Sequence, residues 1–197
     1  MLQTMLQTAF VIQCLLLLSA VVFTQSTTAD WLDRPLTNWN RPGGSVPRPT
    51  SAGETAAQLG IRCDLPVRRG STAERALVDA GWIPFLHVDR EIVRADVEIV
   101  AGMAAIDSAC RPADFNVFVF VSGRLAGTLS PQLMKSDSDG VVGAVRLSAD
   151  DTISADFARY RDRDPSCCPS GRVNVRYRID RSGASAVVVP VSVHAIR

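Results

Sequence analysis

Lysine and histidine, two residues on which much protein chemistry depends, are nearly missing from this chain. Lys135 is the single lysine among 21 Lys and Arg residues, and His87 and His194 are the only histidines among 197 residues. We therefore expect no lysine-based covalent chemistry elsewhere, and no histidine-rich metal site or proton relay. The 21 basic and 20 acidic residues give a formal charge of +1. This balance argues against a nucleic-acid partner.

The familiar catalytic motifs are also missing. The chain contains no GxSxG, Walker A, HExxH or GxGxxG pattern, so no hydrolase, NTPase, metalloprotease or dinucleotide enzyme is indicated. Residues 135–140 resemble a calcium loop, but Lys135 at the first position and Arg146 at the twelfth replace acidic ligands. We interpret this segment as a solvated turn, and both histidines as packed or surface residues. No catalytic residue, metal ligand or cofactor is assigned.

The first 29 residues carry no charged side chain, and residues 9–23 form an apolar run. This run is shorter than the ~20 apolar residues of a membrane span and suits a signal peptide. We predict a signal peptide over residues 1–29, cleaved after Ala29, and hence export to the periplasm or the outside. An uncleaved N-terminal anchor is the alternative, and we expect membrane contact only in that case.

Four cysteines remain after the leader: Cys63, Cys110, Cys167 and Cys168. An even number in an exported chain favours disulfides over free thiols. A bond between the adjacent Cys167 and Cys168 would close a strained eight-membered ring. We therefore expect each of them to pair with Cys63 or Cys110, in either arrangement. A redox-active adjacent pair and a metal site are the functional alternatives.

Composition and hydrophobic periodicity predict three regions: a leader (1–29), a Pro/Gly-rich extended linker (30–60) and one domain (61–197). Trp31 and Trp39 in the linker are expected to pack back on the domain. A capping box at 71–74 predicts a short helix ending near Gly81. Period-two patterns follow, with a hairpin turn at Ser122. The fold class is therefore α+β, an antiparallel β-sheet of about six to seven strands with one short N-terminal helix, stapled by disulfides.

Arginines and aspartates are concentrated beside the cysteine pair. Arg159, Arg161 and Arg163 could together hold an anion by bidentate hydrogen bonds, which makes them candidate anion-binding residues. The simpler interpretation is a set of surface charges that pair with one another and contribute little. Asp96 and Glu98 could likewise form a carboxylate pair, but we interpret them as solvent-facing strand residues.

The most specific motif in the chain is DPSCCPSG at residues 164–171, followed by VNVRY at residues 173–177. Together with the strand near Cys110 and the hairpin of residues 118–128, they resemble the LppP/LprE family of bacterial exported proteins. The likeness covers about residues 93–179. It implies an envelope location and no established enzymatic activity. The chain departs from a lipoprotein pattern because Val11, Ile12 and Gln13, rather than small residues, precede Cys14.

These observations predict an exported bacterial envelope protein acting as a non-catalytic binding or structural module, with an unknown envelope ligand or protein as partner. One alternative is an envelope enzyme, a hydrolase or thiol redox protein, that uses the Asp/Arg/Cys loop of residues 159–168. Another is an envelope protein tethered to the membrane by an uncleaved anchor.

Overall fold

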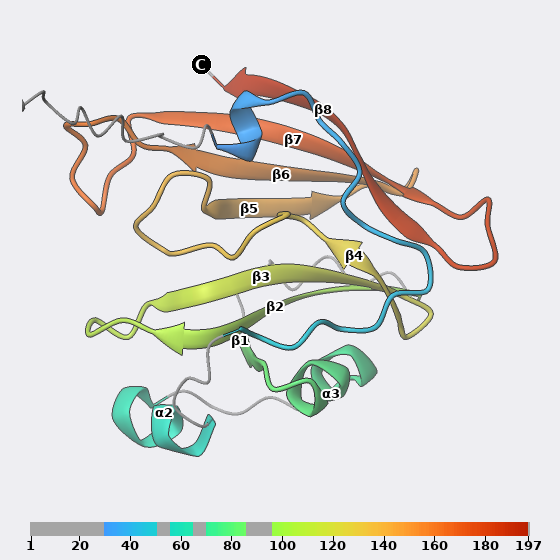
Figure 1. Cartoon of the computed structure of the whole chain (residues 1–197), viewed down its shortest axis with the longest axis horizontal. Coiled ribbons are helices and arrows are strands. Elements are labelled where there is room, and N and C mark those ends of the chain that lie inside the picture. Colours follow the sequence, from blue (N-terminus) through green and yellow to red (C-terminus); the bar gives the residue numbers. More distant parts are fainter. Residues whose placement is uncertain (1–29, 51–55, 65–69, 86–95, 197) are drawn as a thin grey trace, which may run out of the picture.

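The computed structural model describes residues 30–50, 56–64, 70–85 and 96–196, and within them it contains one 3-10 helix, two α-helices and eight strands (Figure 1). The predicted leader (residues 1–29), Cys14 and His87 lie outside the described residues. In chain order the elements are η1 (Trp31–Asp33), α2 (Ala56–Cys63), α3 (Thr72–Asp79), β1 (Ile83–Phe85), β2 (Val97–Ile106), β3 (Pro112–Val121), β4 (Arg124–Thr128), β5 (Val142–Leu147), β6 (Thr152–Arg159), β7 (Gly171–Asp180) and β8 (Val187–Ile196).

The eight strands form two separate antiparallel sheets. The first sheet has the order β1-β2-β3-β4 and the second the order β5-β6-β7-β8, with every neighbouring pair antiparallel. The antiparallel architecture expected from the sequence is confirmed. The expected six to seven strands in one sheet are wrong, because the chain leaves the first sheet after β4 and starts a second one at β5. Local periodicity cannot reveal this change of sheet.

One hydrophobic core fills the space between the two sheets. Its fully buried side chains alternate along the strands, as Val117 and Val119 do on β3 and as Val175 and Tyr177 do on β7. Alternation of this kind places one face of each strand in the core and the other face outward. Burial of such side chains stabilises the fold by about 25 cal/mol for each Å² of apolar surface removed from water.

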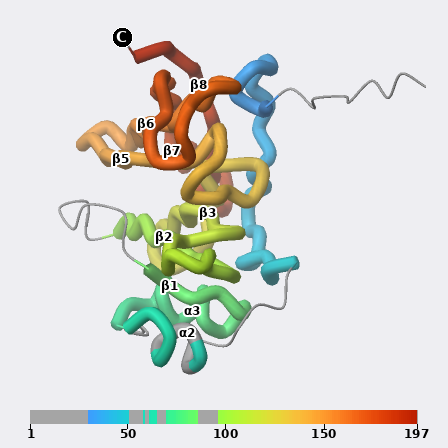
Figure 2. The backbone as a smooth tube through the Cα atoms, turned by 90° about the vertical axis from the view of Figure 1, so that its left-hand side faces the viewer, coloured from blue at the N-terminus to red at the C-terminus, as the bar shows by residue number. Residues whose placement is uncertain are grey.

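Helix α3 covers the outer face of the first sheet and makes a third layer (Figures 1 and 2). Ala73 and Leu77 are fully buried with Phe118 and Phe120 of β3. The predicted capping box is confirmed: the amide of Glu74 donates to Ser71 Oγ (3.0 Å), and Glu74 Oε2 accepts from the Ser71 amide (3.1 Å). The expectation of a single helix is wrong, because α2 precedes α3.

Residues 30–49, here called the strap, run along one side of both sheets (Figure 2). They have little regular structure, as expected of a Pro-rich segment, but they are not a loose linker. Trp31 lies edge-on to Phe157, with ring centroids 5.3 Å apart, and Leu32 is buried in the core. Trp39 Nε1 donates to the carbonyl of Thr128 (3.2 Å). The prediction that the tryptophans pack back on the domain is confirmed. The contacts of Trp31, Leu32 and Trp39 hold the strap against the two sheets.

Two polar side chains, Asn40 and Tyr177, join the two sheets by hydrogen bonds. The Asn40 amide nitrogen donates to the carbonyls of Thr128 on β4 and Val188 on β8, each at 3.0 Å, and Asn40 Oδ1 accepts from the Thr128 amide at 2.8 Å. The hydroxyl of Tyr177 on β7 donates to the Leu129 carbonyl. Gly127 has φ +150°, and a Cβ there would overlap the Asn40 side chain. A glycine is therefore required beside Asn40.

A disulfide joins Cys63, the last residue of α2, to Cys110 in the turn between β2 and β3. Asp107 shapes that turn: its Oδ1 accepts from the amides of Ala109 and Arg111, both at 2.9 Å. The bond with the Arg111 amide is the main cause of the lowered pKa of Asp107. The disulfide thus ties a short helix to the first sheet across 47 residues of sequence.

The second disulfide joins the adjacent residues Cys167 and Cys168 in the connection between β6 and β7. The expectation that each pairs with a distant cysteine is therefore wrong. The sheet topology explains this pairing, because the β6–β7 connection belongs to the second sheet and the Cys110 turn belongs to the first. Cys110 therefore pairs with Cys63 of α2, beside the first sheet, and Cys167 pairs with its neighbour Cys168 in the second.

We expect Asn40→Ala to lower the free energy of unfolding by about 2–4 kcal/mol, because it removes the partner of the buried Val188 carbonyl and of the half-buried Thr128 amide. Urea unfolding followed by circular dichroism measures the loss. Thr37→Ala, an exposed change in the same strap, is the control and is expected to stay within about 0.5 kcal/mol of wild type. Equal effects of the two changes would contradict the role given to Asn40.

The two disulfides are expected to differ in their contribution to stability. The double change Cys63→Ser and Cys110→Ser should cost up to ~4 kcal/mol under oxidising conditions, because the lost bond closes a long loop in the unfolded chain. The double change Cys167→Ser and Cys168→Ser should cost far less, since its ring spans two residues. Thermal unfolding with and without reductant compares them. A larger loss from the adjacent pair would contradict the pairing.

Candidate ligand-binding cleft

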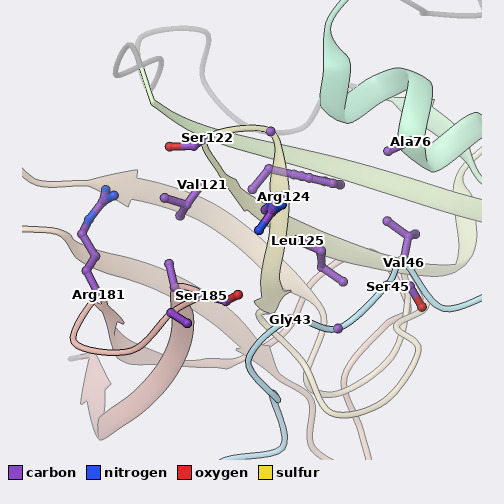
Figure 3. Close-up of a pocket in the computed structure, with 15 residues that line it drawn as sticks. Gly43, Ser45, Val46, Ala76, Val121, Ser122, Arg124, Leu125, Arg181 and Ser185 are labelled. Carbon is purple, nitrogen blue, oxygen red and sulfur yellow. The ribbon is translucent and has the colours of Figure 1, made fainter.

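A cleft of about 780 Å³ opens where the strap meets the ends of two hairpins (Figure 3). Three segments line it: strap residues 43–46, the β3–β4 turn with its flanking residues 120–125, and the β7–β8 connection at Arg181 and 184–186. Ala76 of α3 completes the lining. This volume lies in the range of small-molecule sites, about 300–1,000 Å³. The cleft is therefore a product of three distant parts of the sequence.

The β3–β4 turn presents Arg124 to the cleft. Ser122 and Gly123 both have positive φ, 50° and 73°, as a two-residue type I′ turn requires. The Ser122 amide donates to the Asp96 carbonyl at 2.7 Å, which fixes the turn against the start of β2. The hairpin predicted from Ser122 is confirmed. Arg124 then begins β4 and is exposed.

The β7–β8 connection supplies a second arginine whose charge is already balanced. Arg181 Nε lies 2.6 Å from Asp151 Oδ2, and its Nη1 lies 2.9 Å from Asp96 Oδ2. These contacts, the Asp151 hydrogen bond foremost, raise the pKa of Arg181. Asp96 is thus an ion-pair partner at the cleft rim, rather than half of a carboxylate pair with Glu98.

Arg124 has no hydrogen-bond or ion-pair partner among the described residues. The described lining of the cleft contains no carboxylate, histidine or cysteine. It does contain the hydroxyls of Ser45, Ser122 and Ser185 and the apolar side chains of Val46 and Leu125. An uncompensated guanidinium beside hydroxyls and apolar walls suits an anion that carries an apolar part. Nothing in this lining supplies a general base.

The sequence-predicted anion site is arranged differently. Arg159 ends β6 and is bound by two carboxylates: its Nη2 lies 2.8 Å from Asp33 Oδ2, and its Nε lies 3.1 Å from Asp139 Oδ1. Hydrogen bonding to Asp33 is the main cause of the raised pKa of Arg159. Arg159 therefore holds the strap to the second sheet.

Arg161 and Arg163 are exposed in the β6–β7 connection and do not line the cleft. Asp164 shapes this connection, because its Oδ2 accepts from the amides of Arg161 (2.9 Å) and Ser170 (2.8 Å). These two backbone hydrogen bonds lower the pKa of the Asp164 carboxyl. The conformation of the Asp/Arg/Cys loop is thus fixed by hydrogen bonds between its backbone amides and the Asp164 carboxylate.

A second cavity, about 1460 Å³, lies along the strap between Trp31, Trp39 and the loop before β5. Asp30, Asp33 and Asp139 line it, and Arg159 neutralises the last two. Burial raises the pKa of Asp30, and the nearby charge of Asp139 raises it further. The lining also contains Asp162, Arg34 and Lys135, so carboxylates outnumber cations there, whereas the described lining of the cleft at Arg124 contains no carboxylate.

Sequence reasoning did not identify Arg124. The available signal was its place directly after the Ser122–Gly123 turn, inside the hairpin that carries the family resemblance. A single arginine in a turn is common, so only its neighbours in space distinguish it from the other exposed arginines.

The fold and cleft define a class: a disulfide-containing protein of two antiparallel sheets and a covering helix, with a cleft between hairpin ends. The model of the LppP/LprE lipoprotein family matches residues 94–182, which span β2 to β7, so the resemblance expected from the sequence is confirmed. This match indicates an exported, envelope-associated protein.

No curated protein and no solved structure matches the chain. In the part of the chain that the structure describes, no helix is long and apolar enough to cross a membrane.

The raised pKa of Asp30 predicts a pH-dependent effect on stability. Because the folded protein holds this proton more tightly than the unfolded chain, the contribution of Asp30 is favourable in acid and is lost as pH rises. Asp30→Asn should therefore raise the melting temperature at pH 7, and the difference should vanish below the ordinary value of 3.8. Asp162→Asn, an exposed carboxylate at the same cavity, is the control and should change little. A lower melting temperature for Asp30→Asn at pH 7 would contradict this assignment.

Proposed function

We propose that this chain is an exported, non-catalytic binding protein of the bacterial envelope, and that the cleft at Arg124 holds a small anion with an apolar part. The single observation that carries the proposal is the unpaired Arg124 guanidinium in a lining without carboxylates. A carboxylate or phosphate on the ligand would form charge-assisted hydrogen bonds there. The serine hydroxyls would orient the ligand, and the apolar walls would take up its hydrocarbon part.

Arg181 contributes to the cleft in a different way from Arg124. Asp96 and Asp151 hold its side chain in place, and both carboxylates lie outside the lining. The Arg181 guanidinium therefore forms part of the cleft wall and can donate hydrogen bonds, but its charge is balanced by the two carboxylates. Selectivity for anions depends on Arg124, while Arg181 supports the rim.

Export is supported by the uncharged, apolar leader, by the even number of cysteines after it and by the lipoprotein family match. We place the protein in the periplasm or outside the cell. Cleavage after Ala29 is part of this proposal, and retention of the leader as an anchor is its alternative. Both concern residues 1–29.

The enzyme alternative on residues 159–168 has less support. Arg159 is bound by two carboxylates, and the Asp164 carboxylate accepts two backbone hydrogen bonds. These groups are occupied in holding the strap and the loop. A binding function needs none of them.

The test is calorimetric titration of the protein with decyl phosphate, decanoate and decanol, three probes with the same chain and different head groups. We expect saturable binding of at least one anion and much weaker binding of the neutral alcohol. Arg124→Gln should weaken anion binding about tenfold or more, since a hydrogen bond to a charged group contributes about 1.5–3 kcal/mol.

Arg163→Gln is the matched control, because it removes an equal charge from an exposed loop outside the cleft. Unchanged binding by this variant supports the cleft. Equal weakening by the two changes, or decanol binding as tightly as the anions, would overturn the proposal. A reaction product appearing during the titration would favour the enzyme alternative.

A further inference from the structure

In the part of the chain that the structure describes, the outer face of the second sheet has no covering α-helix. Helix α3 packs on the outer face of the first sheet, where Leu77 and Ala73 are fully buried. No described α-helix packs on the outer face of β5–β8, and the short η1 lies against the second sheet through a core residue, Phe157. Figures 1 and 2 show α2 and α3 gathered beside the first sheet. The residues that this face presents to solvent are therefore available to a partner.

Arginines dominate this face. On β7, Val175, Tyr177 and Ile179 point into the core, so Arg172, Arg176 and Arg178 point outward and are exposed. Arg146 of β5 pairs with Ser154 of β6, which pairs in turn with Arg176. Arg146 and Arg176 thus share one row across the sheet, at two strand spacings of about 4.8 Å each.

The carboxylates on this face do not balance these charges. Asp156 lies 3.5 Å from Arg146, and Asp180 lies 3.5 Å from Arg178, but the two arginine side chains remain 67% and 62% exposed. Arg172 and Arg176 have no ion-pair partner among the described residues. The face carries a surplus of guanidinium groups, whose planar donors suit phosphate.

The edge strand of the same sheet adds apolar surface. Ile196 of β8 pairs with Arg172, so the two side chains lie together on the outer face. Ile196 is 42% exposed, and Val191, at the irregularity of β8, is 59% exposed. Exposed aliphatic side chains next to arginines are typical of surfaces that rest at the boundary between lipid headgroups and acyl chains.

We propose that the outer face of the second sheet docks the protein on an anionic lipid surface, with Arg172 and Arg176 on the phosphates and Ile196 at the edge of the acyl region. A soluble polyanion would use the arginines but would gain nothing from Ile196. The proposed contact is separate from the cleft, since no residue of the described cleft lining lies on this face.

The experiment measures cosedimentation of the full chain with vesicles of phosphatidylcholine, with and without phosphatidylglycerol, at low salt. Residues 1–29 carry no charged side chain, so their only charge is the α-amino group, which is the same in every variant. The ratio of the two partition coefficients then reports the charged face. Because each arginine near an anionic surface contributes about fivefold, Arg172→Gln with Arg176→Gln should lower that ratio about 25-fold.

The matched control is Arg161→Gln with Arg163→Gln, which removes the same charge from the exposed β6–β7 connection. We expect this control and Arg124→Gln to keep most of the ratio, and circular dichroism to show that all variants are folded. Equal loss in the control, or a ratio near one for wild type, would overturn the proposal. Ile196→Ser should weaken binding to vesicles but not to polyphosphate. If it changes neither, the surface binds a soluble polyanion and the assignment to lipid is wrong.

Discussion

The hydrogen bonds by which Asn40 bridges β4 and β8 are the constraint on which the other features of the structure depend. Asn40 of the strap hydrogen-bonds to Thr128 on β4 and to Val188 on β8, and so it joins the edge strands of both sheets. Without Asn40, the buried Val188 carbonyl and the half-buried Thr128 amide would lose this partner, which is costly. Once Asn40 is seated, the following residues 43–46 are placed beside the hairpin ends. The cleft exists because the strap is held there.

The distribution of charge separates structural arginines from available ones. Arg159 and Arg181 each bind two carboxylates, and in doing so they hold the strap and the β7–β8 connection in place. Arg124 in the cleft and Arg172 and Arg176 on the outer face of the second sheet have no such partners in the described structure. A nearly neutral chain can therefore present local positive sites, because acidic residues such as Asp33, Asp96 and Asp139 form ion pairs with other arginines.

Local signals in the sequence were sufficient for the elements near the cleft. The capping box began α3 at the expected place, and the Ser122–Gly123 pair formed the expected turn, because both depend on contacts within four residues. The pairing of the cysteines and the role of Arg159 could not be predicted in this way. They depend on which sheet each loop joins and on how close the strap comes to β6.

The antiparallel strands and the start of α3 could be predicted from the sequence, since alternation and capping act locally. The family resemblance lay in its motifs, and the packing of Trp31 and Trp39 on the domain followed from their large apolar surface. The division into two sheets, the pairing of Cys167 with Cys168 and the difference between Arg124 and the paired arginines depend instead on long-range packing. Those outcomes follow from packing between segments as much as 148 residues apart, such as Asn40 and Val188. No local pattern in the chain records which distant groups will meet.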